Sequence, residues 1–150
     1  MAKTFDTLPQ LLIDDLRKEV IVSLITVTAE NEAQVSAVSW LLPSEDGKKI
    51  AIAVGHKGSS ISNLEKNPNV TLGVLAVDTY YSIKGKASVS EIIEKTMKYR
   101  VITIEITEVE DAMFYGGKVV QLPKYKKTYD ATLAEKLDNE VHELLLEYLK

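Results

Sequence analysis

The feature that most constrains this chain is a series of short segments rich in Val, Ile and Thr, separated by turn residues. Six of them are predicted to be strands, at residues 20–28, 34–42, 49–54, 70–77, 80–89 and 100–109. The small apolar residues of 49–54 predict a strand buried on both faces, and Gly85 within 80–89 indicates a bulge or a close backbone approach. Parallel strands need a long crossover between them, usually a helix, and only one short central helix is predicted here. The pattern therefore favours an antiparallel β-barrel that is closed or nearly closed.

Helices are predicted at both ends of this barrel. Over residues 8–18, Pro9 suits a first helical turn. The apolar face of that helix is predicted to consist of Leu8, Leu11, Leu12 and Leu16. Over residues 131–149, Thr132 and Glu135 fit a capping box. The apolar face of this second helix is predicted to consist of Leu133, Leu137, Val141, Leu144, Leu145 and Tyr148.

The length suits one domain. A chain of 150 residues with 45% hydrophobic and 27% charged residues is expected to bury a sizeable core. We expect a single domain over 1–150, with the barrel at 20–122 between the helices at 8–18 and 131–149. The class is mainly β, a six-stranded antiparallel barrel with flanking helices.

Charge and cysteine content exclude several functions. The sequence has no cysteine, which excludes disulfides, thiol nucleophiles and iron–sulfur clusters. Its net charge of −4 does not favour binding to nucleic acid. No segment resembles a secretory signal or a membrane span, so we expect a cytoplasmic location and no membrane partner.

One basic segment contains Lys124, Lys126 and Lys127, interleaved with Tyr125 and Tyr129. Lysines between aromatic residues suit single-stranded nucleic acid. Three lysines in a predicted loop are more typical of a solvated surface, and that is the interpretation adopted.

Hydrolytic and metal-dependent catalysis are disfavoured. His56 and His142 are the only histidines, and no Gly-x-Ser-x-Gly motif is present. Two distant histidines without cysteine have no zinc-type spacing, so no metal site is predicted. His142 falls in the predicted C-terminal helix, whereas His56 falls in a loop flanked by glycines.

That loop, residues 55–60, has the most informative local chemistry. Gly55, His56 and Lys57 precede Gly58 and two serines, and a short helix follows. Ser59 or Ser60 is predicted to cap this helix. Free N–H groups and the helix dipole at such a turn attract anions. Local chemistry leaves two interpretations open, a phosphate site and an ordinary capping turn.

The order of several motifs carries a family resemblance. Ser-Ala-Val-Ser-Trp-Leu at 36–41 precedes Ile-Ala-Ile-Ala-Val at 50–54. Ser-Ile-Ser-Asn-Leu at 60–64 then leads to Asn-Pro-Asn-Val-Thr-Leu at 67–72, and Tyr-Ser-Ile-Lys-Gly-Lys-Ala follows at 81–87. This ordered set, over about residues 10–110, resembles the FMN-binding split barrels of the pyridoxamine 5′-phosphate oxidase-like family.

The resemblance implies a homodimer with FMN at the subunit interface. Val54 and Gly55 would approach the flavin or ribityl chain by their backbones. Ser59 and Ser60 would bind its phosphate, and Tyr80 would reach the flavin from the partner subunit. The predicted cofactor-binding residues are Ser36, Ala37, Val38, Ser39, Trp40, Val54, Gly55, His56, Lys57, Ser59, Ser60, Asn63, Tyr80 and Lys84.

The sequence departs from the family pattern at charged positions. Ser60 stands where the family usually has a lysine, so the phosphate would depend on N–H groups, hydroxyls and Lys57 or Lys84. We therefore expect weaker FMN retention than in the authentic oxidases. The arginines that bind the substrate phosphate in those oxidases have no counterpart, which argues against vitamin B6 oxidation.

The resemblance supports one main functional hypothesis. It is an FMN-dependent oxidoreductase or flavin reductase-like protein acting on a small molecule, in which the flavin supplies the chemistry. His56, Tyr80 and Lys84 are the side chains available as helpers. The alternatives are a non-enzymatic barrel that stores or senses flavin, one that binds haem through His56, and an empty structural barrel. The substrate and electron donor do not follow from the sequence.

Overall fold

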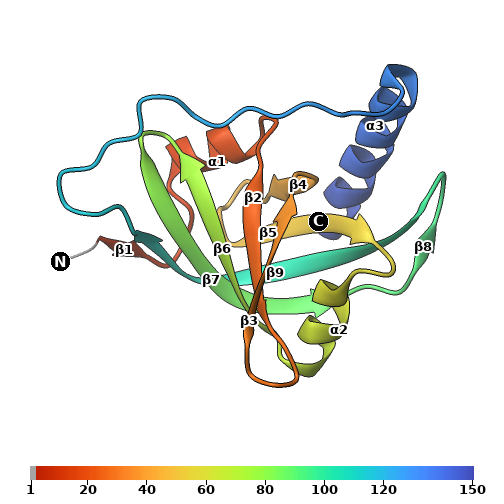
Figure 1. The fold of residues 1–150 in the computed structure, drawn as a ribbon, viewed down its shortest axis with the longest axis horizontal. Helices are drawn as coiled ribbons and strands as arrows, with labels where there is room; N and C mark the ends of the chain where they lie inside the picture. Colours follow the sequence, from red (N-terminus) through yellow and green to blue (C-terminus); the bar gives the residue numbers. More distant parts are fainter. Residues whose placement is uncertain (1–2) are drawn as a thin grey trace.

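The strand-forming segments build one antiparallel sheet in the computed structural model, which describes residues 3–150. Three helices flank this sheet (Figure 1). In chain order the elements are β1 (Thr4–Phe5), α1 (Gln10–Leu16), β2 (Val22–Val27), β3 (Ala33–Val38), β4 (Leu41–Pro43), β5 (Lys49–Gly55), α2 (Ser59–Lys66), β6 (Asn69–Ala76), β7 (Thr79–Val89), β8 (Ile93–Glu94), β9 (Lys98–Asp111) and α3 (Ala131–Tyr148).

The topology shows why the sheet curls. Its strand order is β3-β2-β6-β7-β9-β5-β4, with β1 and β8 also paired to β9. β3 and β4 are therefore at opposite edges, although only Ser39 and Trp40 separate them in the chain. Two linking residues span at most about 11 Å from strand end to strand end. The two edges must come together, and the expected split-barrel class is confirmed.

The number of strands differs from the expected six, because the sheet has nine. The predicted strand 34–42 breaks at Ser39 and Trp40, where the chain crosses from one sheet edge to the other. Residues 91–97, between the fifth and sixth predicted strands, contain β8, which pairs with the start of β9. Residues 118–122 form no strand, since a single backbone bond from Val119 to Asp78 does not make a ladder.

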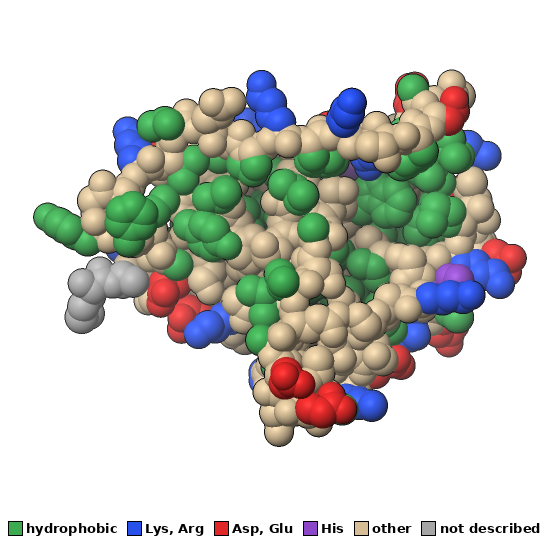
Figure 2. Space-filling view, viewed as in Figure 1, with side chains coloured by type: hydrophobic (Ala, Val, Ile, Leu, Met, Phe, Trp, Pro, Cys, Tyr) green, Lys and Arg blue, Asp and Glu red, His purple; other side chains and the backbone are tan. Residues whose placement is uncertain are grey.

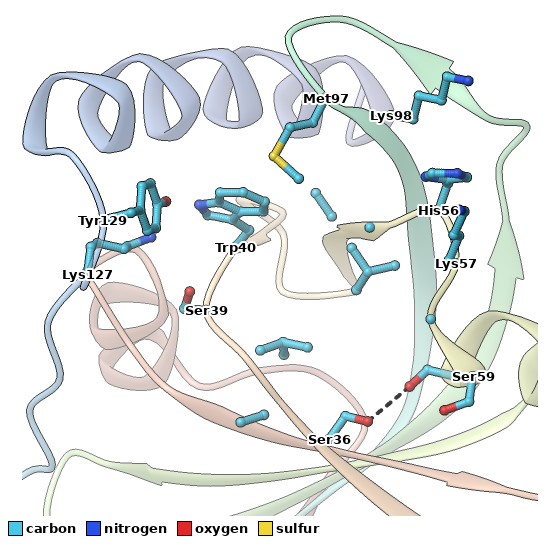
Figure 3. A pocket seen from close by; sticks show the side chains of 17 residues that line it. Ser36, Ser39, Trp40, His56, Lys57, Ser59, Met97, Lys98, Lys127 and Tyr129 are labelled. Carbon is cyan, nitrogen blue, oxygen red and sulfur yellow. Dashed lines mark hydrogen bonds between the residues drawn. The ribbon is translucent and has the colours of Figure 1, made fainter.

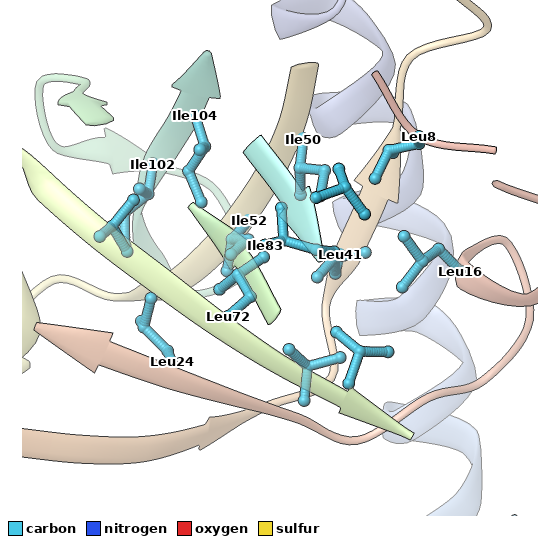
Figure 4. Packing of buried hydrophobic residues seen from close by; sticks show 14 of the residues in the cluster. Leu8, Leu16, Leu24, Leu41, Ile50, Ile52, Leu72, Ile83, Ile102 and Ile104 are labelled. Carbon is cyan, nitrogen blue, oxygen red and sulfur yellow. The ribbon is translucent and has the colours of Figure 1, made fainter. Parts of the chain in front are cut away.

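The core has two parts, inside and outside the curl. Inside, apolar side chains of β2, β5, β6, β7 and β9 pack with α1 (Figure 4). Outside, α3 packs on β4, β5 and β9 through Leu137, Val141 and Leu144. Both faces of β5 are therefore covered, and its run of small apolar residues is buried as the sequence predicts.

The buried faces and the caps of the helices differ in detail from the predictions. Leu11 was expected on the buried face of the first helix but is 64% exposed, and Ile13 is buried instead. The expected Thr132 cap of the last helix is wrong. Asp130 caps α3, and its carboxylate accepts a hydrogen bond of 2.9 Å from the Leu133 N–H. Leu133, expected on the apolar face of α3, is 40% exposed.

Gly85 marks a bulge, as a glycine within a strand predicts. The register between β7 and β9 shifts between Lys84 and Gly85. A bulge bends its strand and increases the local twist. Gly85 therefore contributes to the curl of the sheet, and its close packing carries a prediction developed in the Discussion.

The turn between β6 and β7 is strained and is held by a carboxylate. Val77 has a φ of 60°, a left-handed conformation that is costly for a β-branched residue. Its N–H donates a bond of 2.6 Å to an Asp15 carboxylate oxygen, and Lys18 pairs with the other oxygen at 3.0 Å. Burial would raise the pKa of Asp15, but the Val77 and Lys18 interactions outweigh it and lower the pKa.

Asp15→Asn is expected to destabilise the fold by about 1–3 kcal/mol at pH 7, since a charge-assisted bond is lost. Because folding lowers the pKa of Asp15, its contribution is fully present above the unfolded value near roughly 4. It is lost as the pH falls through the lower folded value. Urea unfolding of wild type and variant at pH 7 and at pH 3 measures this difference.

Asp14→Asn is the matched control, because Asp14 is exposed on the same helix and bonds only Gln10 among the described side chains. Its effect should stay within about 0.5 kcal/mol at both pH values. A stability difference for Asp15→Asn that does not shrink in acid would contradict the assigned bond.

Candidate functional site

A pocket of about 730 Å³ opens between the end of β3, the turn from β5 into α2, and the segment leading into α3 (Figure 3). Small-molecule sites are roughly 300–1,000 Å³. The lining residues are Ser36, Ala37, Val38, Ser39, Trp40, Ala53, Val54, Gly55, His56, Lys57, Gly58, Ser59, Ser60, Met97, Lys98, Lys127 and Tyr129.

The structure brings most of the predicted site residues together at this pocket. The curled sheet places the end of β3 opposite the end of β5, so residues 36–40 and 54–60 share one opening. Of the predicted residues, Asn63, Tyr80 and Lys84 are outside the lining. Binding of FMN by these residues stays a prediction.

Asn63 does not line the pocket but bonds to residues of the strands behind it. Its side chain is buried and donates to Thr26 Oγ1 at 3.0 Å and to Gln34 Oε1 at 3.2 Å. Gln34 in turn donates to Ser59 Oγ. Asn63 therefore ties α2 to β2 and β3, and Gln34, which the sequence analysis missed, links it to the pocket.

Two serines and a helix start form one end of the pocket. Ser36 and Ser60 hydroxyls lie 3.2 Å apart within hydrogen-bond distance (Figure 3). Ser59 Oγ accepts its bond from Gln34, which leaves the hydroxyl proton free to donate to a ligand. Lys57 is at the rim of the same end.

The backbone adds donors at this end. The expected cap by Ser59 or Ser60 is wrong, because Gly58 is the N-cap of α2 and no side chain caps it. The first turn of a helix leaves its N–H groups without intrahelical partners. Within residues 3–150, no backbone carbonyl accepts from the N–H groups of Ser59 or Ser60. These groups are therefore available to an anion.

Tyr80 and Lys84 lie on the outer face of the sheet. A Cβ added to Gly73 would be 2.6 Å from Tyr80 Oη, so the tyrosine ring lies across Gly73 on β6. Lys84 is exposed and lines a separate pocket with Ile25 and Thr71. Neither side chain reaches the main pocket within its own chain, so contact from a partner subunit stays a prediction for Tyr80.

The opposite end of the pocket is aromatic and was largely missed. Trp40, Met97 and Tyr129 meet there with the Lys127 side chain (Figure 3). The interpretation of 124–127 as solvated surface is correct for Lys124 and Lys126 but wrong for Lys127. Lys127 is only 20% exposed and pairs with Asp138 at 3.1 Å. The alternation of lysine and tyrosine over residues 124–129 was the one sequence signal that could have indicated a partly buried lysine here.

α3 also fixes the hairpin that carries Met97. Glu140 accepts bonds from the Thr96 N–H and hydroxyl, and from Tyr99 Oη at 2.7 Å. Burial opposes ionisation of Glu140, but these bonds outweigh it and lower its pKa. Burial and the bond to Glu140 raise the pKa of Tyr99. The pair therefore remains a neutral phenol bonded to a carboxylate.

Charge distribution favours anions in this pocket. Among the described residues that line it are three lysines, Lys57, Lys98 and Lys127, and no aspartate or glutamate. That bias is notable in a chain with 22 acidic residues. Across residues 3–150, no group of three or more acidic or histidine side chains is placed to hold a metal ion.

None of the helices described between residues 3 and 150 combines the length and the apolar character needed to cross a bilayer.

Comparisons with known proteins fall on the same part of the chain. A sequence model of pyridoxamine 5′-phosphate oxidase matches residues 10–111. A search of curated protein sequences finds no match. The match ends before the segment that carries Lys127 and Tyr129.

Solved structures share the fold at low identity. A protein of Lactobacillus delbrueckii named as a candidate pyridoxamine 5′-phosphate oxidase has a TM-score of 0.61 and 21% identity, over 72% of this chain and 97% of its own. HupZ of Group A Streptococcus has a TM-score of 0.59 and 13% identity, over 76% and 99%. An F420 reductase has a TM-score of 0.54 and 17% identity, over 67% and 96%.

Proposed function

Because the chain belongs to the pyridoxamine 5′-phosphate oxidase family, whose members typically bind a flavin, we propose that it binds FMN in this pocket. The bound flavin would serve oxidation or reduction of a small molecule. The observation that carries the proposal is a pocket that combines an anion-binding end with an apolar wall and has no carboxylate in its lining.

The serine end suits the FMN phosphate. The N–H groups of Ser59 and Ser60 begin α2, where the helix dipole favours negative charge. The Ser59 hydroxyl has a proton to donate, and Lys57 adds a positive charge at the rim. This donor set replaces the lysine that Ser60 displaces from the family pattern.

The apolar wall suits the flavin ring. Val38, Ala53 and Val54 line the pocket from strands β3 and β5. FMN supplies hydride or electron transfer when bound, and the protein orients it and excludes water. His56 is half-buried and lines the same pocket from the turn before α2.

A homodimer is part of the proposal. Hydrophobic side chains gather over β2, β3, β6 and β7 on one face (Figure 2). Val35 is 66% exposed there, opposite Ile25 in the register of β2 and β3. An exposed apolar patch of this kind on a sheet commonly marks an interface. Because β3 also borders the pocket, a partner seated on this face would lie beside the cofactor.

Absorption spectra of the purified protein, before and after FMN addition and dialysis, test the proposal. We expect a flavin spectrum after FMN addition and partial loss on dialysis, since Ser60 stands where the family usually has a lysine. Light scattering should give the mass of two chains, and one FMN should bind per chain.

The opposite results favour the alternatives. A monomer with no flavin spectrum at either stage would contradict the proposal and leave an empty barrel. A haem spectrum that His56→Ala abolishes would instead identify a haem-binding barrel.

A further inference from the structure

The aromatic end of the pocket has features that an FMN site does not require. We define it by Trp40, Met97, Lys127 and Tyr129. Lys127 and Tyr129 come from the segment between β9 and α3, beyond the part of the chain that the family match covers. This segment runs along one edge of the molecule from the end of β9 to α3 (Figure 1). Two of the four residues at this end therefore lie outside the family match.

The Trp40 ring is held on three sides. Its indole N–H donates to Asp138 Oδ1 at 2.9 Å. Tyr99 meets the ring edge-on, with centroids 5.8 Å apart and planes at 74°. Lys127 Nζ lies 5.2 Å from the ring centroid. A half-buried ring fixed in this way presents a flat surface to the pocket (Figure 3).

Lys127 keeps donors for a ligand. Its ammonium has three N–H groups, and Asp138 takes one of them at 3.1 Å. Burial would lower the pKa of Lys127, but the bond to Asp138 outweighs it and raises the pKa, so the cation persists at neutral pH. The Tyr129 hydroxyl belongs to the same end of the pocket and offers a further donor.

We propose that this aromatic end binds a planar aromatic carboxylate, as the second ligand beside FMN. The ring of that ligand would stack on Trp40, and its carboxylate would accept from Lys127 and Tyr129. The proposal rests on the proposed function in one respect, that the FMN phosphate occupies the serine end.

Charge selects a carboxylate over a phosphate at this end. Asp138 already neutralises Lys127, so this end has no unpaired cation to balance the two charges of a dianion. The Lys127 N–H groups that Asp138 leaves free can donate to one carboxylate. A phosphate has three strong acceptor oxygens and favours arginine clusters or helix N-termini. No arginine is among the lining residues, and the only helix start in that lining belongs to the serine end.

Two titrations test this proposal. Trp40 is the sole tryptophan of the sequence, so its fluorescence in flavin-free protein reports directly on this end. Calorimetry measures binding to the FMN-loaded dimer. The probe is 4-nitrobenzoate, compared with neutral 4-nitrobenzyl alcohol and dianionic 4-nitrophenyl phosphate.

We expect 4-nitrobenzoate to quench Trp40 saturably and to bind FMN-loaded protein without displacing the flavin. Lys127→Met should weaken 4-nitrobenzoate about tenfold, the scale of one charge-assisted bond. It should leave the affinity for the neutral alcohol unchanged. Lys127→Arg should restore most of the loss. Lys126→Met is the matched control, because Lys126 is an exposed lysine of the same segment and does not line the pocket.

Three results would overturn the proposal: displacement of FMN by 4-nitrobenzoate, equal affinity in wild type and Lys127→Met, or tighter binding of the phosphate than of the carboxylate at Trp40. Failure of FMN to bind is a separate result. It would leave the fluorescence titration of flavin-free protein intact, so the two proposals can fail independently.

Discussion

Replacing Ser59 and Ser60 together with alanine is expected to weaken FMN binding by about 100-fold. A hydrogen bond to a charged group contributes about 1.5–3 kcal/mol, and about 1.4 kcal/mol is a factor of ten in affinity. The Ser59 hydroxyl is free to donate, and the Ser60 hydroxyl is bonded to Ser36 at the same end of the pocket. Both backbone N–H groups remain in the variant, so binding should weaken without vanishing.

Flavin fluorescence titration measures this change. Ser62→Ala is the matched control, because Ser62 is an exposed serine of the same helix that bonds the Ser59 carbonyl and does not line the pocket. It should bind FMN as the wild type does. A double variant whose affinity stays within threefold of the wild type would show that the phosphate is bound elsewhere.

Gly85→Ala is expected to destabilise the fold by at least about 3 kcal/mol, the upper end of the cost of overpacking a core. An added Cβ would lie 2.4 Å from the Glu105 carbonyl oxygen and 2.5 Å from Ile104 Cγ2. The carbonyl belongs to the backbone of β9 and cannot rotate away as a side chain can. A loss of this size is a large part of the roughly 5–15 kcal/mol that stabilises a typical domain.

Urea unfolding of wild type and variant measures this loss. Gly55→Ala is the control, since a Cβ at Gly55 meets nothing within 4 Å. Its stability should change by less than about 1 kcal/mol. If both variants unfold at the wild-type urea concentration, the β7 and β9 strands are less tightly packed at the bulge than the structure indicates.

Local patterns predicted much of the fold. Segments rich in Val, Ile and Thr predicted the strands, since β-branched side chains pack well on a pleated sheet. A glycine within a strand predicted the bulge at Gly85, and the small apolar residues of β5 predicted burial on both faces. The predictions failed where the conformation depends on which distant strands pair. Ser39 and Trp40 break a continuous pattern because the chain must cross between sheet edges there.

The candidate site also has one part that the sequence predicted and one that it did not. The turn before α2 was found from the sequence, because glycines, serines and a helix start lie within six consecutive residues. Only Trp40 of the aromatic end was predicted, because Trp40 and Lys127 are 87 positions apart in the sequence. They meet only in the folded chain, where Lys127 lies over the Trp40 ring and both side chains bond Asp138. Lys127 was interpreted as solvated for the same reason.

The sequence by itself determined the strand-rich class, the antiparallel connections and the turn that we propose as an anion site, because each depends on neighbouring residues and on the periodicity of one element. Only the tertiary structure decided which edges of the sheet meet, how the segment before α3 borders the pocket, and which lysine is held in it. Those features depend on contacts between residues far apart in the chain, and such contacts leave no periodic signal in a single sequence.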